Sequence, residues 1–176
     1  MRKLLFLLFT LPLAALTGCL GDNTVSYSDW RKDNTAFYAA AAEKLDDDGQ
    51  PYYERLTPEW APEMTLLVRR HRTSPADAMR PMDNSLVNVV YEGKLVDDTV
   101  FDNSFSNTDS IYQTRPLNNV AGFWATLTTM AENDSVTVIM PSTAGYGEYG
   151  NGSVPPYSTL VFDIKLKKIV AWDAPE

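Results

Sequence analysis

The sequence is poor in the residues that build disulfides and zinc sites. Its 176 residues include one cysteine, Cys19, and one histidine, His71. A single cysteine excludes an intrachain disulfide, and a single histidine without cysteine companions gives no zinc-ligand pattern. His71 also has no evident nucleophile partner. We therefore predict no metal site, no cofactor and no histidine-assisted nucleophile.

Basic residues are scarce relative to acidic ones. Lys and Arg number 15 against 23 Asp and Glu, which gives a formal net charge of −8. Nucleic acids and anionic membrane surfaces attract basic proteins, so this balance argues against either as the main partner. The basic cluster at residues 69–72 lacks interleaved aromatics, and we interpret it as the solvated end of a strand.

The N-terminal apolar run, Leu4 to Leu16, is of signal-peptide length and too short to span a bilayer. Two basic residues precede it, and Leu16-Thr17-Gly18-Cys19 ends it. This ending resembles the bacterial lipobox, in which small residues precede a cysteine that is lipidated. We expect residues 1–18 to be a lipoprotein signal peptide and the lipid on Cys19 to hold the protein to a membrane of the bacterial cell envelope, facing the periplasm or the cell surface. The alternative is an ordinary cleaved leader with a stray thiol.

The remaining composition is that of a globular protein. Hydrophobic residues make up 44% and charged residues 22% of the chain, which argues against wholesale disorder. Eleven prolines and nine glycines imply many turns, which favours a β-rich architecture. We expect a tether at 19–28, an N-terminal extension containing a helix and a strand at 29–84, and a globular domain at 85–176.

The extension is predicted to begin with a helix from Trp30 to Leu45. Apolar residues recur on one face at helical spacing, and Ser28 or Asp29 can cap the first turn. The acidic run at 46–48 lacks the alternating ligand spacing of a calcium loop, so we interpret it as a solvated helix terminus. Residues Met64 to Arg72 are predicted to form a strand.

From Leu86 onward the pattern indicates antiparallel strands and one helix. Strands are predicted at 86–95, 99–102, 112–117, 135–140 and 160–169 from β-branched and aromatic content and from alternation. A helix is predicted from a cap at Asn118 or Asn119 to about Ala131. Its apolar stripe has 3.6-residue spacing and consists of Val120, Phe123, Trp124, Leu127, Met130 and Ala131. The predicted fold class is α+β, a sheet with a helix on one face.

Residues 145–164 form a stretch dense in glycine, proline and aromatics that ends in the last predicted strand. Its loop carries Tyr146, Tyr149, Val154 and Tyr157. Large side chains on a shaped loop beside a rigid strand can form a small pocket. An ordinary hairpin connection with buried tyrosines is the alternative.

Several motifs occur together in one order. They are Tyr91-x-Gly93-x-Leu95, Phe101-Asp102-x-Ser104, Val120-x-Gly122-Phe123, Tyr146-Gly147 and Val154-Pro155-Pro156 followed by Ser158-Thr159-Leu160-Val161-Phe162-Asp163. This set, from about Leu86 to Ile169, resembles the FKBP-type peptidyl-prolyl cis–trans isomerases. The resemblance implies a twisted antiparallel β-sheet wrapping a short helix. It also implies isomerase activity on proline-containing polypeptides, assistance in the folding of exported proteins, and a macrolide as a further ligand.

The resemblance also implies a site, an apolar pocket for a substrate proline. Its catalytic positions fall on Tyr146, whose hydroxyl would bind a substrate carbonyl, on Val120, whose backbone N–H would bind another, and on Asp102 at the rim. Its substrate-binding positions fall on Tyr91, Phe101, Phe123, Val154 and Phe162. Rotation about an X-Pro bond meets a barrier of about 20 kcal/mol from amide resonance and needs no nucleophile or metal.

Several positions depart from the family's pattern, and two of them bear most on activity. The family usually has Trp at the pocket floor, where this chain has Phe123, and the first aromatic of its Phe-x-Phe pair falls near Ser110, with Tyr112 aligning to the second. Trp124 is adjacent to Phe123, but one helical step turns its side chain by about 100°. These departures leave two alternatives open. One is a non-catalytic binding module or chaperone for proline-containing segments, and the other is a structural lipoprotein whose aromatics are only core.

Overall fold

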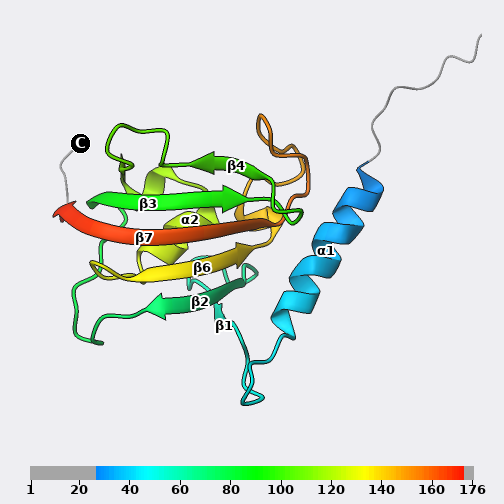
Figure 1. Ribbon diagram of the computed structural model, residues 1–176, viewed down its shortest axis with the longest axis horizontal. Coiled ribbons are helices and arrows are strands. Elements are labelled where there is room, and N and C mark those ends of the chain that lie inside the picture. The colour runs from blue at the N-terminus through cyan, green and yellow to red at the C-terminus, as the bar shows by residue number, and fades with distance from the viewer. Residues whose placement is uncertain (1–26, 173–176) are drawn as a thin grey trace, which may run out of the picture.

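A computed structural model describes residues 27–172 of the chain (Figure 1). The predicted signal peptide at 1–18, Cys19 and most of the predicted tether lie outside the described residues. Among the helices that are described, none combines the length and the apolar character needed to cross a membrane.

The described residues form two α-helices, two 3-10 helices and seven strands. In chain order these are α1 (Ser28–Ala42), β1 (Glu54–Leu56), β2 (Leu66–Arg72), β3 (Leu86–Lys94), β4 (Val100–Asn103), β5 (Tyr112–Thr114), η1 (Pro116–Asn118), α2 (Ala121–Leu127), β6 (Ser135–Met140), η2 (Ser142–Ala144) and β7 (Leu160–Ala171).

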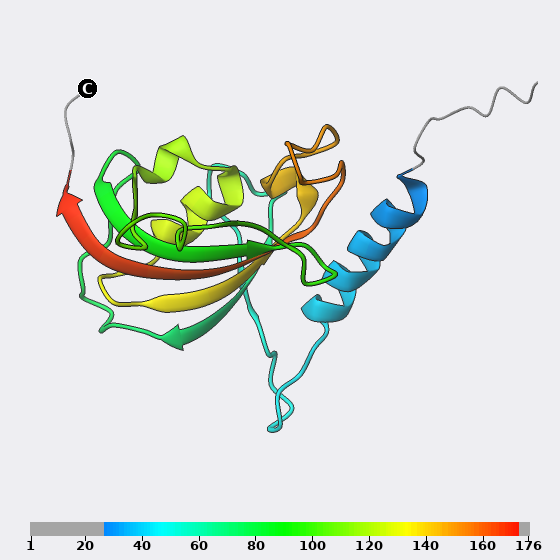
Figure 2. The same cartoon turned by 45° about the horizontal axis from the view of Figure 1, so that its top comes forward.

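All seven strands join one antiparallel sheet with the order β1-β2-β6-β7-β3-β4, and β5 pairs with β3. The helix α2 covers one face of this sheet, while α1 stands beside the end of the sheet next to the loop that precedes β7 (Figures 1 and 2). The predicted α+β class, the antiparallel sheet with a short helix and the N-terminal helix are confirmed.

The core lies between the sheet and α2. Along β7 the side chains of Leu160, Phe162, Ile164 and Leu166 are buried, and Asp163 between them is exposed. This is the predicted period-two alternation, because successive side chains of a strand point to opposite faces of the sheet. Burial of each large apolar side chain contributes about 1.5–3 kcal/mol, so the alternation fixes which face of β7 meets α2.

The first helix differs from its prediction at both ends. It begins at Ser28 with Tyr27 at the N-cap position and no side-chain cap, and it ends at Ala42. Leu45 therefore lies outside the helix and is exposed. Phe37 is only half-buried, and the one residue of α1 that is fully buried is polar, Asn34. The helix thus meets the rest of the protein through hydrogen bonds more than through an apolar stripe.

The second helix is shorter than predicted and has a different cap. Its N-cap is Val120, because η1 takes up Asn118 and because the Asn119 side chain bonds backward, donating to the carbonyl of Arg115 at 2.7 Å. The helix ends at Leu127 instead of Ala131. Strand β5 ends at Thr114, two residues before Pro116 begins η1 and earlier than the predicted strand limit, because proline cannot continue the strand's hydrogen bonding.

Candidate functional site

A cavity of about 210 Å³ opens between β3, α2 and the loop before β7. We call it the aromatic cavity, and its lining residues are Tyr91, Asp102, Tyr112, Asn118, Asn119, Val120, Phe123, Tyr146 and Phe162. Six of the eight site residues implied by the family resemblance line this cavity. The sheet supplies the walls and α2 the base, so the cavity is built mainly on regular elements.

Three aromatic rings from two strands and one helix meet at the base of the aromatic cavity. The Phe123 ring centroid lies 5.5 Å from that of Tyr91 and 5.3 Å from that of Phe162, both in edge-to-face geometry. Such ring pairs are preferred over face-to-face stacking and contribute about 0.5–1.5 kcal/mol beyond their buried area. Phe123 is only 3% exposed, so its ring is held firmly as the floor of the cavity.

Phe101 and Val154, the other two predicted pocket residues, are not part of the lining. The Phe101 ring packs 6.4 Å from the ring of Tyr146 and 5.5 Å from that of Phe162. Val154 is buried in the core, and its backbone forms an isolated bridge with Asn151. Phe101 therefore supports two rings of the cavity from outside, whereas Val154 belongs to the core.

Gly93 explains the Tyr-x-Gly spacing in β3. A Cβ atom at this position would lie 2.7 Å from Cζ of Phe101 and 2.7 Å from Cε1 of Phe162. Real Cβ contacts are not this short, so only glycine lets both rings pack over the strand. Tyr91 lies two residues earlier and so points to the same face of the sheet, which places its ring in the same cluster.

A hydrogen bond joins the floor of the aromatic cavity to its rim. The Tyr91 hydroxyl donates to Oδ2 of Asp102 at 2.7 Å. Burial, followed by this hydrogen bond to a carboxylate, raises the pKa of Tyr91 well above its ordinary value. The phenol therefore stays protonated as a donor, while Asp102 presents its carboxylate at the exposed edge of β4.

Tyr146 provides a second hydroxyl at the aromatic cavity. It follows η2 and is half-buried. Burial raises the pKa of Tyr146, and a side-chain hydrogen bond with Asn151 lowers it in part. The hydroxyl is thus neutral and able to donate a hydrogen bond to a ligand carbonyl.

Three lining residues were missed at the sequence level: Tyr112, Asn118 and Asn119. The sequence pattern predicts a helix cap at one of the two asparagines, whereas they belong to η1 and the turn after it. Their position directly before Val120 was the available signal. Tyr112 has its ring centroid 5.5 Å from that of Tyr91, and the available signal for it was its alignment with the second aromatic of the family's Phe-x-Phe pair.

Trp124 and His71 lie away from the aromatic cavity. Trp124 stacks on Trp60 with ring centroids 4.3 Å apart and donates from Nε1 to Asp83, so it does not replace Phe123 at the floor, as predicted. Nε2 of His71 lies 2.8 Å from the Thr137 hydroxyl. Within residues 27–172, no group of three or more His, Cys, Asp or Glu side chains is arranged to hold a metal ion.

The aromatic cavity suits a small apolar ring attached to a polar backbone. Its base is aromatic, and its lining also carries three phenol hydroxyls, a carboxylate and two asparagines. A ligand could therefore bury an apolar group against Phe123 while its carbonyl groups accept hydrogen bonds nearer the surface.

Comparison with known proteins identifies relatives in the matched region. A family model described as FKBP-type peptidyl-prolyl cis-trans isomerase matches residues 77–167. A probable FKBP-type peptidyl-prolyl cis-trans isomerase FkpA of Neisseria meningitidis is 39% identical over 101 residues, which are 56% of this chain and 36% of that protein. The FKBP-type 22 kDa peptidyl-prolyl cis-trans isomerase of Escherichia coli is 39% identical over 92 residues, 51% of this chain and 44% of that protein. The chain thus matches less than half the length of these relatives.

Solved structures share the fold. A peptidyl-prolyl cis-trans isomerase from Pseudomonas syringae has a TM-score of 0.65 at 23% identity and covers 82% of this chain and 96% of that one. FkpA from Escherichia coli has a TM-score of 0.63 at 24% identity and covers 84% of this chain and 64% of that one. The family model spans just over half of the sequence, and its region contains the aromatic cavity, so the chain belongs to the FKBP-type peptidyl-prolyl cis-trans isomerase family.

Proposed function

We propose that the protein is a peptidyl-prolyl cis–trans isomerase that assists the folding of exported proteins. The observation that carries this proposal is the aromatic cavity, in which Phe123, Tyr91 and Phe162 form an apolar base next to hydrogen-bonding groups. Its volume of about 210 Å³ is sufficient for a proline ring. The names of the matched relatives agree with this activity.

In the proposed mechanism, the substrate proline enters the aromatic cavity and its amide leaves water. A planar amide is more polar than a twisted one, so an apolar site disfavours the planar ground state relative to the twisted transition state. The Tyr146 hydroxyl and the backbone N–H of Val120 donate to substrate carbonyls, and Asp102 lies at the rim. Lowering the barrier by about 5 kcal/mol would accelerate rotation several-thousand-fold.

The experiment that tests this function is a proline-peptide isomerisation assay on the purified protein. We expect a rate above the uncatalysed background and competition by a macrolide ligand. The second candidate function is a binding module without turnover. Phe123 supports it, because the position usually holds Trp in the family and a Phe ring offers no N–H. Background rates with peptide binding still measurable by titration would favour the binding module, and loss of both would contradict both.

We also propose that the protein is lipid-anchored in the bacterial cell envelope. The support is the sequence Leu16-Thr17-Gly18-Cys19 after the apolar run. Cleavage before Cys19 would remove residues 1–18, and residues 19–28 would connect the lipid to the extension at 29–84 and the domain at 85–176. Mass spectrometry of the mature N-terminus tests this, since a lipid-modified cysteine is expected for the natural protein. An unmodified cysteine, or membrane attachment unchanged in Cys19→Ser, would contradict the anchor.

A further inference from the structure

The helix α1 contacts the loop that carries Tyr146. We call residues 145–159 the pre-β7 loop. Three consecutive residues at its end each contact α1, and they are Tyr157, Ser158 and Thr159. These contacts join segments about 125 residues apart in the sequence, and α1 lies before the region matched by the family.

The strongest contact involves Asn34, which is 1% exposed on a helix that is otherwise largely in solvent. Its Oδ1 accepts a hydrogen bond from the backbone N–H of Thr159 at 2.6 Å, and its Nδ2 donates to the Trp30 carbonyl at 2.8 Å. The Thr159 hydroxyl donates in turn to the Asn34 carbonyl at 3.1 Å. A buried amide with both ends satisfied fixes the geometry of its partners, because losing one bond leaves a buried polar group without a partner.

Two neighbouring contacts extend the junction. Nε1 of Trp30 donates to the Ser158 hydroxyl at 3.0 Å, and the Ser158 hydroxyl donates to the Pro155 carbonyl at 2.7 Å. The guanidinium of Arg31 lies 4.5 Å from the ring centroid of Tyr157. Exposed cation–π contacts of this kind contribute about 0.5–1 kcal/mol.

The junction leads directly to the wall of the aromatic cavity. The backbone N–H of Tyr157 donates to the Gly147 carbonyl at 2.8 Å, and Gly147 follows Tyr146. Tyr157 has a φ of +62°, a conformation that costs a non-glycine residue energy and persists only when its surroundings hold it. The contacts with α1 and with Gly147 provide this support. A displacement of Tyr157 would therefore reach Tyr146 through one hydrogen bond.

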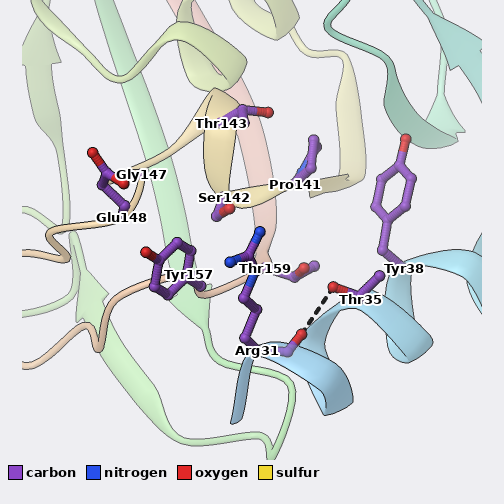
Figure 3. A pocket seen from close by; sticks show the side chains of 10 residues that line it. All are labelled: Arg31, Thr35, Tyr38, Pro141, Ser142, Thr143, Gly147, Glu148, Tyr157 and Thr159. Atoms are coloured by element: carbon purple, nitrogen blue, oxygen red, sulfur yellow. Dashed lines mark hydrogen bonds between the residues drawn. The ribbon is translucent and has the colours of Figure 1, made fainter. Parts of the chain in front are cut away.

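A cleft of about 430 Å³ borders this junction between α1 and the loop. It is bounded by Arg31, Thr35 and Tyr38 on the helix and by Ser142, Glu148 and Tyr157 opposite (Figure 3). Packing therefore does not hold the loop against α1 along its length. The hydrogen bonds at the junction fix its position, and a segment with few packed neighbours moves when such bonds are lost.

We propose that α1 is a positioning element for the aromatic cavity, in which Asn34 and Trp30 hold the pre-β7 loop so that Tyr146 faces a bound proline segment. The link to substrate rests on the proposed function. The claim that α1 fixes the position of the loop does not rest on the proposed function, so each claim can be contradicted without the other.

The test compares Asn34→Ala with Thr35→Ala in the full chain. Thr35 borders the same cleft, but its hydroxyl donates only within α1, to the Arg31 carbonyl, which makes it a matched control. We expect Asn34→Ala to speed amide hydrogen exchange across residues 145–159. Well below both melting temperatures, we expect it to lower kcat/KM for a proline peptide by roughly three- to tenfold, mainly through KM, since the loss is one buried hydrogen bond. Thr35→Ala should change neither quantity.

A second variant keeps the test decisive if Asn34→Ala does not fold. Trp30→Phe removes the donor to Ser158 and keeps an aromatic ring, and it should produce the same effects at smaller size. Combining either variant with Tyr146→Phe should give less than the sum of the two losses in kcat/KM, because both act through one hydroxyl. Wild-type exchange across 145–159 in the variants would overturn the proposal, as would a lowered melting temperature with unchanged KM. A wild-type protein that neither isomerises nor binds proline peptides would contradict the proposed function alone, because hydrogen exchange needs no substrate.

Discussion

The hydroxyl of Tyr91 and the carboxylate of Asp102 form a 2.7 Å hydrogen bond between adjacent strands. Tyr91 is 8% exposed in the core, whereas Asp102 is exposed. The bond therefore couples a ring of the cavity floor to a charge at the cavity mouth. A substitution at either residue therefore also changes the surroundings of the other.

Asp102→Ala should reduce turnover while leaving the melting temperature within a few degrees of wild type. The carboxylate is exposed, so its removal costs little packing, and water can replace it as the acceptor for the Tyr91 hydroxyl. The isomerisation assay and thermal denaturation measure the two effects. Asp77→Ala, an exposed change in the connection before β3, is the control. A large loss of stability with unchanged activity would mean that Asp102 belongs to the fold and not to the site.

Tyr146→Phe should lower kcat/KM for a proline peptide without unfolding the protein. The variant keeps the ring that packs against Phe101 and removes only the hydroxyl proposed to bind a substrate carbonyl. Loss of one such hydrogen bond corresponds to roughly a threefold to tenfold effect. Tyr149→Phe is a matched control, because Tyr149 lies in the same loop and is 84% exposed. Equal activities for the two variants would remove Tyr146 from the mechanism.

Phe123→Trp tests the departure at the cavity floor. The larger ring should fill the base of the aromatic cavity, add an N–H donor and raise the affinity for proline peptides. Phe123 is packed between Tyr91 and Phe162, so overpacking should cost about 1–3 kcal/mol of stability. Peptide titration and chemical denaturation measure both. Lower affinity in a folded variant would show that the cavity is already filled to its working depth.

Gly93→Ala should destabilise the protein and disturb the aromatic cavity together. The added methyl group would meet the rings of Phe101 and Phe162 at 2.7 Å, and moving them should cost about 1–3 kcal/mol. Denaturant unfolding and near-ultraviolet circular dichroism report on stability and ring packing. Asn88→Ala, a half-buried change in the same strand, is the control for an ordinary substitution. Wild-type stability in Gly93→Ala would contradict the close approach of the rings.

The raised pKa of Tyr91 predicts a loss of stability in alkaline solution. The folded pKa lies above the ordinary value of 10.0, so the neutral phenol is favoured in the folded state. Its contribution is fully present below pH 10.0 and is lost as pH rises toward the folded pKa. Urea unfolding across this window should show a shallower decline in Tyr91→Phe than in wild type. Parallel declines in the two proteins would show that Tyr91 does not contribute.

Local pattern was enough to predict most of the sheet, and long-range contacts explain what it missed. Strand β6 has the predicted limits of Ser135 and Met140, because its β-branched residues end at a proline. Strand β1 has only three residues, too few to show alternation. The helix cap was wrong because the side chain of Asn119 bonds to the preceding turn, a choice that depends on where Pro116 starts η1.

The same contrast applies to the candidate site. The family motifs identified six lining residues, of which Tyr91, Asp102, Phe123 and Phe162 lie in strands or in α2. The junction between Asn34 and Thr159 could not be predicted, because an asparagine on a polar helix has no sequence signal for a partner 125 positions away. Asn34 is buried only because the folded chain brings Thr159 against it.

The position of β7 has a consequence for how the protein is made. This last strand lies in the interior of the sheet, paired with β6 on one side and β3 on the other. A nascent chain leaves the ribosome N-terminus first, so β3 and β6 emerge before the strand that joins them exists. The two halves of the sheet can meet only after residue 160 and its successors have been synthesised. Until then both halves have open edges that invite wrong pairing, so the sheet cannot close before β7 has been made.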